Sequence, residues 1–308
     1  MDPPPDLPKP PLPGPLGRRK VLNLWWQLTR ASAIVMTAVV SLSLSIVGAG
    51  GHLSASLWAH VLFSSLMLVG VSYGSDLSNM VYDGLREDSV HQTKKFRPVP
   101  MRQVDPEVVL ANATSIWLVT GIIAALFYGP YYTAALLATA FTAYIYSAPP
   151  RTKNGIVSNG VGITLPRSLF GPMAAFLAGS GGTLGPSFWY VLAISVPLVL
   201  LAGEIRNLEP DATADRTFGV RTISNTYGEW AGWAICITGM VLAPILAFTL
   251  GLMTSDPFLW GLAIPPVLMV AAHMRGWSRH ITHQIYHYSF VAGILAYSAP
   301  WLIKAAGL

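Results

Sequence analysis

Two long stretches without any charged residue constrain this chain more than any other feature. They run from Val108 to Pro150 and from Ser168 to Gly203, and each is long enough for more than one membrane crossing of about 20 residues. Only 11% of the 308 residues are charged, against about 25% in an ordinary soluble domain, and 53% are hydrophobic. The composition therefore predicts an all-α membrane protein with several transmembrane helices.

Polar breaks divide the apolar sequence into nine predicted spans. Gly129-Pro130 separates the third and fourth spans, as in a helical hairpin, and the fifth is interrupted by Arg167 and several glycines. The nine spans cover residues 30–50, 57–78, 107–128, 131–148, 156–178, 186–206, 229–252, 257–273 and 284–303. Nine spans place the two ends of the domain on opposite sides of the membrane.

The sequence before the first span differs in composition from the rest. Residues 1–20 are rich in proline and lack the apolar segment of a signal peptide, so they are predicted to form a disordered tail. Residues 21–308 are predicted to form one transmembrane domain. The single cysteine, Cys236, excludes an intramolecular disulfide and an all-cysteine metal site.

Lysine and arginine gather in alternate loops. They flank the first span and fill the loops after the second, fourth, sixth and eighth spans, whereas the other loops contain Asp256 and no lysine or arginine. The positive-inside rule therefore places the N-terminus and the charged loops in the cytoplasm and the C-terminus on the opposite side. The net charge of +5 thus reflects membrane topology as much as the binding of an anionic ligand. The cations lie in short loops and not in a basic domain, so nucleic acid is not an expected partner.

Two of the positively charged loops carry the same arrangement of an amide and two acids, spaced four residues apart. The members are Asn79, Asp83 and Glu87 after the second span, and Asn207, Asp211 and Asp215 at the end of the sixth. On a helix this spacing places all three side chains on one face. Pro210 fits only the first turn of a helix, so Asn207 is expected to end the sixth span and Asp211 and Asp215 to begin a new segment.

These side chains suit a particular ligand. Mg²⁺ usually binds through a few carboxylates together with substrate phosphate oxygens, so two facing sets of acids indicate a metal diphosphate. The nearby cations that could neutralise diphosphate oxygens are Lys94, Lys95, Arg97, Lys153 and Arg221. With the leaving group held in this way, an allylic C–O bond can break to a carbocation. The simpler alternative is a set of solvated acids paired with neighbouring bases, but the matched spacing of the two sets favours the metal site.

In these motifs the chain resembles the UbiA superfamily of intramembrane prenyltransferases. The first family motif, roughly N-D-x-x-D-x-x-x-D followed by R-P-[ILV]-P, resembles the sequence from Asn79 to Glu87 followed by Arg97-Pro98-Val99-Pro100. The second, D-x-x-x-D followed by G-x-x-[ST]-L-P, resembles the sequence from Asp211 to Ile223. Two further matches are "YSAPPRTKNG", which contains Tyr146 and Lys153, and an arginine near the start of the first span, Arg30.

The resemblance implies both a fold and an activity. The implied fold is a nine-helix bundle around a central cavity, with a cytoplasmic cap of helical loops. In it, Mg²⁺ and the two acidic motifs would hold an isoprenyl diphosphate. Three positions depart from the family pattern: Met80 replaces an acid, Glu87 replaces an aspartate and Ser224 replaces a proline. Asp76 or Asp88 could compensate for the acid that Met80 removes.

Asp76 and Arg167 fall inside predicted spans. An ionisable residue within a membrane span marks a functional site by default. Arg167 is expected to face the cavity, where it could contact a diphosphate or an acidic acceptor. Pairing of Asp76 with Arg30 or Arg167 is the structural alternative.

These observations predict an Mg²⁺-dependent prenyltransferase that transfers the prenyl group of an isoprenyl diphosphate to a hydrophobic or aromatic acceptor in the lipid bilayer. The predicted catalytic and metal-binding residues are Asn79, Asp83, Glu87, Asp211 and Asp215. The predicted substrate-binding residues are Arg30, Asp76, Lys94, Arg97, Tyr146, Lys153, Arg167, Asn207 and Arg221. Chain length, acceptor and oligomeric state are not predicted.

Two other functions fit parts of the same pattern. A terpene cyclase of the same fold would ionise the same diphosphate and let the chain's own double bonds attack, in a closed aromatic cavity without an acceptor site. A transporter or lipid-binding membrane protein would explain the spans, and its two matched motifs would reflect an internal repeat. The loop-borne acids and cations fit a chelated diphosphate better than a transport site in the middle of the membrane.

Overall fold

The computed structural model describes residues 28, 31–90, 94–208 and 212–307. The predicted tail over residues 1–20, Arg30 and Asp211 lie outside these residues. For Asn207, the backbone alone is described.

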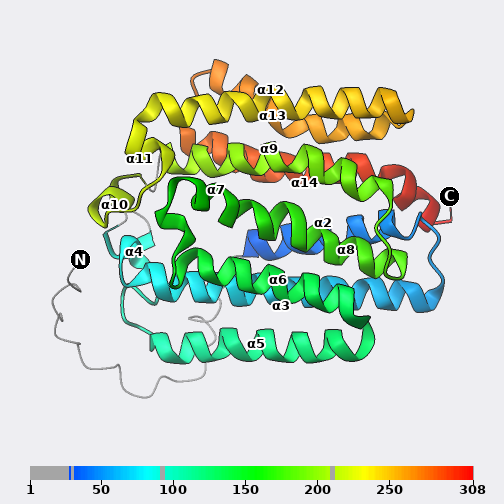
Figure 1. The fold of residues 1–308 in the computed structure, drawn as a ribbon, viewed down its shortest axis with the longest axis horizontal. Coiled ribbons are helices and arrows are strands. Elements are labelled where there is room, and N and C mark those ends of the chain that lie inside the picture. The colour runs from blue at the N-terminus through cyan, green and yellow to red at the C-terminus, as the bar shows by residue number, and fades with distance from the viewer. Residues whose placement is uncertain (1–27, 29–30, 91–93, 209–211, 308) are drawn as a thin grey trace.

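Every regular element in the described residues is a helix, and the long helices follow the nine predicted spans in order (Figure 1). They are α2 Ala31–Gly48, α3 Ala55–Gly84, α5 Pro106–Phe127, α6 Gly129–Ser147, α7 with η3 and α8 Ile156–Ser180, α9 Pro186–Leu208, α12 Glu229–Thr254, η4 with α13 Pro257–Met274, and α14 Arg279–Ala305. The short elements are α4 Glu87–Val90, η1 Lys94–Phe96, η2 Thr152–Asn154, α10 Ala212–Thr217 and α11 Ile223–Tyr227.

Five of the described helical runs are long and apolar enough to cross a membrane. They are Ala55–Gly84, Pro106–Phe127, Ile156–Ser180, Glu229–Thr254 and Pro257–Met274. Ala33–Gly48 and Pro186–Leu201 form shorter apolar helices. Large apolar side chains such as Leu126, Leu252 and Met253 are more than two-thirds exposed on the long helices, as expected for surfaces that face lipid. The structure therefore confirms an all-α chain with membrane-length apolar helices.

Local signals in the sequence set several helix ends. The Ser54 side chain accepts a hydrogen bond from the Leu57 N–H at 3.2 Å at the start of α3. The Asp105 side chain caps α5 in the same way at the N–H of Glu107, and Pro106 occupies the first turn. Gly129 adopts a positive φ of 78° between α5 and α6, a conformation that glycine allows without steric cost. These caps explain why the apolar runs break where they do.

The fifth long run changes its helical form near its middle. α7 (Ile156–Thr164) passes into a π-helix, η3 (Leu165–Phe170), and then into α8 (Gly171–Ser180). Pro166 and Pro172 each remove a backbone N–H donor, which favours a departure from regular α-helix. Arg167 lies in the π-helical turn, and such turns are frequent at functional sites.

Glycine allows α2 and α8 to pack in close contact. A Cβ atom on Gly179 would lie 1.8 Å from the carbonyl oxygen of Ser45, and one on Gly48 would lie 2.6 Å from that of Phe176. Small residues at helix interfaces let backbones approach in this way in membrane proteins. The main hydrophobic core lies beside this contact and includes Phe188 and Tyr297.

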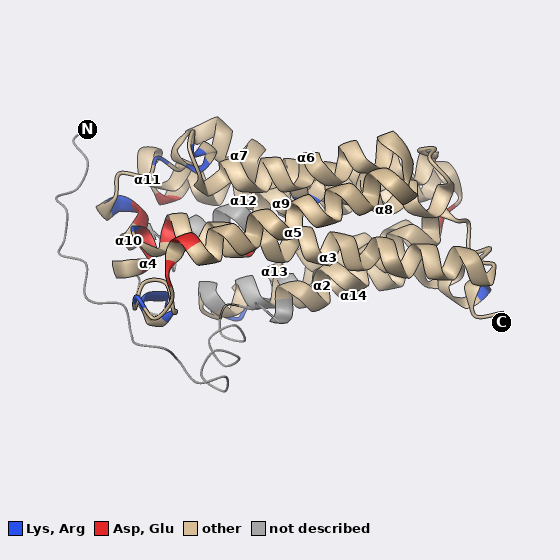
Figure 2. Cartoon of the chain, turned by 90° about the horizontal axis from the view of Figure 1, so that it is seen from below, with Lys and Arg blue, Asp and Glu red and all other residues tan. Residues whose placement is uncertain are grey.

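The charged residues gather at one end of the bundle. The long helices run side by side along the long axis, with α12 and α13 in one outer layer and α5 in the opposite one (Figure 1). Figure 2 shows most acidic and basic residues at the end that holds α4, α10 and α11. The helices α4 and α10, which carry Glu87 and Asp215 of the two acidic sets, therefore lie at the same end of the molecule, and the apolar helices extend away from it.

Candidate active site

The first acidic set is divided between two helices. Asn79 and Asp83 lie one turn apart on α3, but this helix ends at Gly84 and Glu87 begins α4. The three side chains therefore do not lie on one continuous helix, which was the condition for them to share a helical face. The helix ends here because Gly84, a poor helix former, lies against the following loop, where an added Cβ would approach Val99 to 3.0 Å. A turn closed by the Arg86 N–H and the Asp83 carbonyl then starts the next segment.

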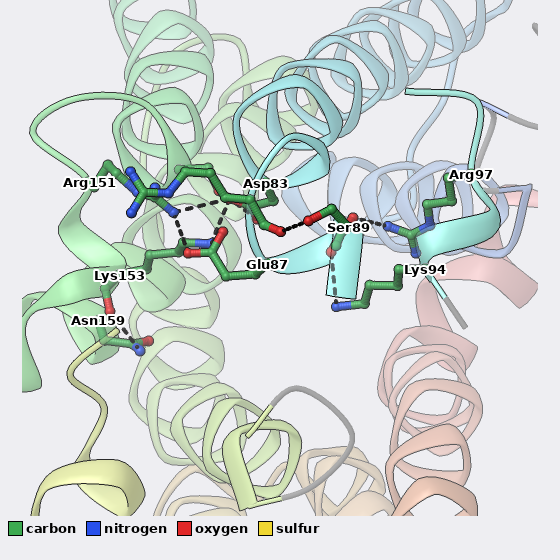
Figure 3. Close-up of polar contacts among 11 residues, drawn as sticks. Asp83, Glu87, Ser89, Lys94, Arg97, Arg151, Lys153 and Asn159 are labelled. Carbon is green, nitrogen blue, oxygen red and sulfur yellow. Dashed lines mark hydrogen bonds and ion pairs between the residues drawn. The ribbon is translucent and has the colours of Figure 1, made fainter. Parts of the chain in front are cut away.

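Two cations from the loop between α6 and α7 bring Asp83 and Glu87 together (Figure 3). Lys153 Nζ lies 2.6 Å from Asp83 Oδ1 and 3.4 Å from Glu87 Oε2. Arg151 Nη2 lies 2.8 Å from Glu87 Oε1 and 3.5 Å from Asp83 Oδ1. Ser147 Oγ donates a further hydrogen bond to Asp83 Oδ2 at 3.1 Å. We call Asp83, Glu87, Arg151 and Lys153 the charge cluster.

The charge cluster is largely closed to water. The exposed fractions of the Glu87 and Lys153 side chains are 5% and 7%, and that of Arg151 is 10%. Buried charges are costly unless they are paired, so two acids and two bases stabilise one another here. In this low-dielectric setting the cations act strongly on any anion that enters.

A second group of charges fixes the loop that follows α4. Arg97 Nη1 lies 3.0 Å from Asp88 Oδ2, and Lys94 Nζ lies 3.8 Å from Asp88 Oδ1. Asp88 is buried, and its oxygens therefore orient Lys94 and Arg97. Lys95 instead is exposed, and its ammonium lies over the ring of Phe96.

Tyr146 is linked to the charge cluster through Asn159. Its hydroxyl donates to Asn159 Oδ1 at 3.4 Å, and Asn159 Nδ2 donates to the Lys153 carbonyl at 3.2 Å. Asn159 is buried in α7. The described contacts thus connect Tyr146 to the backbone of the loop that carries Lys153.

The second acidic set is only partly described. Asn207 lies in the last turn of α9, as predicted, and Asp215 is buried in the short helix α10. Arg221 is exposed just before Thr222, which caps α11. The guanidinium of Arg86 lies 5.8 Å from the ring centre of Phe218. This contact joins the segment after α3 to the segment that follows Asp215.

Asp76 and Arg167 lie deeper along the bundle. Asp76 is half-buried on α3, two turns before Asp83, and Arg167 lies in η3.

Sequence reasoning missed Arg151, Ser147 and Asn159. Arg151 was visible as a second cation two residues before Lys153, but the family pattern drew attention to Lys153 alone. Ser147 follows Tyr146 directly, and Asn159 lies in an apolar run in which a lone amide is a weak signal. Asp88 was expected as a possible substitute for the acid that Met80 removes, but in the structure it pairs with Lys94 and Arg97.

Several buried polar atoms at this end have no hydrogen-bond partner within the described residues. They include Asn79 Oδ1, Arg86 Nε and Arg151 Nε, whereas Glu87 Oε2 makes no hydrogen bond but forms an ion pair with Lys153 Nζ. The free oxygen of Asn79, one turn before Asp83 on α3, fits a hard cation such as Mg²⁺. The described residues contain no group of three or more acidic, histidine or cysteine side chains that could hold a metal alone. A metal here would therefore need further oxygens, as Mg²⁺ obtains from a phosphorylated substrate.

The apolar helices and this buried acid–base site define an integral membrane protein with a polar site at one end of its bundle. The model of the UbiA prenyltransferase family matches residues 16–294, and the chain belongs to this family. A search of curated proteins by sequence found no match.

Solved structures of similar fold include UbiA homologues from two organisms. One from Archaeoglobus fulgidus, bound to DMAPP and Mg²⁺, is 15% identical with a TM-score of 0.68, over 90% of this chain and 99% of the other. The apo homologue from Aeropyrum pernix K1 is 17% identical with a TM-score of 0.68, over 88% and 98%. A structure concerned with digeranylgeranylglyceryl phosphate synthase in membranes is 15% identical with a TM-score of 0.66, over 92% and 99%. At these identities the likeness shows the fold alone.

Proposed function

We propose that this protein is an Mg²⁺-dependent intramembrane prenyltransferase that ionises an isoprenyl diphosphate and transfers the prenyl group to an aromatic or lipid-like acceptor. The observation that carries the proposal is the buried charge cluster, in which Asp83 and Glu87 meet Arg151 and Lys153. A metal diphosphate needs oxygen ligands for the metal and cations for the phosphate, and this end of the bundle supplies both.

The proposed roles follow from the chemistry of each side chain. Oxygen ligands for the metal come from Asn79, Asp83, Glu87, Asp211 and Asp215. Support for the diphosphate comes from Lys94, Arg97, Tyr146, Lys153 and Arg221. The remaining substrate contacts are assigned to Arg30, Asp76, Arg167 and Asn207. Asp88 supports this arrangement indirectly, because it orients Lys94 and Arg97.

The reaction requires heterolysis of one bond. When bound, Mg²⁺ neutralises negative charge that develops on the diphosphate leaving group. Lys153 adds a buried positive charge, which is worth more at this site than in water. As the C1–O bond breaks, its electron pair stays on the diphosphate and C1 becomes an allylic cation. The nucleophilic atom of the acceptor then bonds to C1, and the proton that it loses passes to solvent.

The comparisons support the substrate class. The Archaeoglobus fulgidus homologue is bound to DMAPP and Mg²⁺ in one structure and to GPP and Mg²⁺ in another. Both ligands are prenyl diphosphates, the class that the charge cluster fits by its own chemistry. Family membership adds the same expectation independently of these structures.

We also propose that all nine helical runs cross the membrane and that the end with the charge cluster faces the cytoplasm. Agreement between the predicted spans and the observed helices supports the number of crossings. The gathering of lysine and arginine at one end supports the orientation. In this arrangement residues 21–308 form one domain, its short helices cap a central cavity on the cytoplasmic side, and Arg167 lies where it can contact the substrates.

Product analysis by mass spectrometry tests the proposal. Purified protein is incubated with Mg²⁺ and prenyl diphosphates of several lengths, each with and without aromatic and lipid acceptors. We expect a prenylated product that forms only when an acceptor is present. A cyclised hydrocarbon or alcohol formed without an acceptor would identify a terpene cyclase, and no diphosphate release under any condition would favour a transporter or lipid-binding protein.

Substitution of Asp83 tests the site itself. We expect Asp83→Asn to lower diphosphate release at least ~100-fold, because it removes a metal ligand and a partner of Lys153. Asp211→Asn is expected to have an effect of the same order. Arg275→Gln removes an exposed cation from the loop between α13 and α14 and serves as the control. Unchanged turnover in both acid variants would contradict the proposed site.

A further inference from the structure

Arg151 is held in an unusual position at the centre of the charge cluster. Its backbone adopts a left-handed conformation with φ 58° and ψ 70°, which is uncommon for a residue with a side chain. The side chain is 90% buried, since its exposed fraction is 10%, and it reaches Glu87 and Asp83 from across the loop. Its Nε has no hydrogen-bond partner within the described residues. A buried guanidinium with an unused donor has capacity for another anionic ligand.

The charges of the cluster balance only while no ligand is present. Two carboxylates and two cations sum to zero in the arrangement shown in Figure 3. The same carboxylate oxygens that would bind a metal are those that Arg151 and Lys153 occupy. If Asp83 and Glu87 bound a divalent cation while both bases stayed in place, like charges would face one another in a buried site. The bases must therefore acquire another anion when the carboxylates acquire a metal.

We propose that Arg151 is a diphosphate-binding residue that is stored on Glu87 and Asp83 before the substrate arrives. On loading, Asp83 and Glu87 exchange their two cations for the metal, and Arg151 and Lys153 turn to the diphosphate oxygens. The guanidinium fork suits this exchange, because it can bind a carboxylate or a phosphate through paired N–H groups. This inference rests on the proposed function and adds Arg151 to its substrate-binding residues.

The exchange couples metal binding to diphosphate binding. Each ligand relieves the charge imbalance that the other creates, so each should raise the affinity for the other by the same factor. Arg151→Gln removes the competitor for Glu87 and one phosphate ligand. We expect metal binding without diphosphate to tighten about 10-fold, and diphosphate binding with metal to weaken about 10-fold.

The first test uses Mn²⁺, a paramagnetic substitute for Mg²⁺. Electron paramagnetic resonance measures how much of the added Mn²⁺ stays free and therefore how much is bound. The diphosphate probe is geranyl S-thiolodiphosphate, in which sulfur replaces the bridging oxygen and suppresses ionisation. Wild type, Arg151→Gln and the control Arg275→Gln are titrated with and without the probe. We expect the factor by which the probe raises the affinity for Mn²⁺ to fall in Arg151→Gln and to keep its wild-type value in Arg275→Gln. A wild-type factor in Arg151→Gln overturns the inference. If wild type binds no probe with metal present, the proposed function fails instead.

A metal-free measurement keeps the inference testable if Arg151→Gln does not fold. In EDTA, Glu87→Gln removes the main partner of Arg151 and leaves the guanidinium available. We expect calorimetry to show about 5-fold tighter binding of the probe to Glu87→Gln than to wild type. The gain should vanish in the Glu87→Gln/Arg151→Gln double variant, which removes both partners of the ion pair and so avoids the unpaired Glu87 carboxylate that would destabilise Arg151→Gln alone. Equal probe affinity in wild type and Glu87→Gln would show that Arg151 only holds the loop in place.

Discussion

Lys153 lies between two carboxylates on a side chain that is 7% exposed. Its Nζ is 2.6 Å from Asp83 Oδ1, and its carbonyl accepts a hydrogen bond from Asn159. Breaking a buried ion pair by removing one partner usually costs more than the pair contributes, because the other charge remains buried. Lys153 therefore affects the stability of the fold as well as the proposed chemistry.

We predict that Lys153→Gln lowers the free energy of unfolding by about 3 kcal/mol, since it leaves Asp83 and Glu87 with Arg151 as their remaining described cation. The double variant Asp83→Asn/Lys153→Gln should recover part of this loss, because it removes the uncompensated carboxylate. Unfolding in mixed detergent micelles measures each value. Losses that simply add in the double variant would contradict the ion-pair interpretation.

Asp256 has a different environment at the opposite end of the bundle. Its side chain caps η4 by accepting a hydrogen bond from the Phe258 N–H at 3.1 Å. Burial raises the pKa of Asp256 above its usual value, although this hydrogen bond acts in the opposite direction. The folded state therefore holds the proton more tightly than the unfolded state. Stability contributed by this residue falls as pH rises from the ordinary value of 3.8 through the raised one.

Two substitutions of Asp256 distinguish the contribution of its helix cap to stability from the contribution of its charge. Asp256→Ala loses the capping oxygen and should cost about 1 kcal/mol at pH 7. Asp256→Asn keeps an oxygen acceptor and removes the partly desolvated charge, so it should be at least as stable as wild type at pH 7. Its advantage should shrink as pH falls to 4, where wild-type Asp256 gains its proton. Thermal unfolding at both pH values measures this, and an Asn variant as unstable as Ala would show that the charge itself is required.

At the level of single residues, sequence reasoning found part of the site. Spacing and resemblance selected Asp83, Glu87 and Lys153, which the structure brings together, although their catalytic roles stay predictions. Arg151 was missed because its contact with Glu87 depends on a left-handed turn after Pro150, which no sequence pattern specifies. Asp88 was considered as a metal ligand, but its partner Arg97 lies nine residues away and only the folded loop brings them together.

Helix packing depends on glycine at the contact between α2 and α8. Gly179 faces the backbone of Ser45 so closely that a Cβ atom cannot fit without separation of the two helices. Backbone atoms cannot move aside as a flexible side chain can. Gly185 lies in the loop after α8, where an added Cβ meets nothing within 4 Å.

We predict that Gly179→Ala destabilises the protein by about 3 kcal/mol, the upper end of the range for overpacked sites. Gly185→Ala should change stability by less than ~0.5 kcal/mol and serves as the matched control. Thermal unfolding in detergent compares the two. Equal melting temperatures would mean that α2 and α8 can separate without cost.

Sequence reasoning predicted long elements better than short ones. The length of each apolar run and signals such as Gly129-Pro130 placed seven of the nine spans within two residues of the observed helix ends, but α3 ends six residues later than predicted and α14 begins five residues earlier. The end of α3 at Gly84 was not predicted, because it depends on contact with Val99 in a later loop. The π-helix around Arg167 was missed for a similar reason, since periodicity of apolar residues does not distinguish it from an α-helix.

At the scale of the whole molecule, most charged residues lie at one end and the apolar helices form the rest of the bundle. The charged end is the one with α4 and α10 (Figure 2). The long helices instead present large apolar side chains on their surface. This separation fits a substrate with an anionic head and a hydrocarbon tail, because the charged end suits the head and the apolar helices suit the tail. Together with the positive-inside rule, it predicts that the diphosphate enters from the cytoplasmic side.

Cysteine labelling tests that orientation on α3, whose first turn and following segment lie at opposite ends of the bundle. Cys236 is buried and is replaced by alanine to give a cysteine-free background. Ser89→Cys and Ser56→Cys then place single thiols at exposed positions in α4 and at the start of α3. We predict that a membrane-impermeant maleimide labels Ser89→Cys only in inside-out vesicles and Ser56→Cys only in right-side-out vesicles. Labelling of both thiols from one side would mean that α3 does not cross the membrane. The reverse pattern would place the charge cluster outside, where cytoplasmic prenyl diphosphates could not reach it.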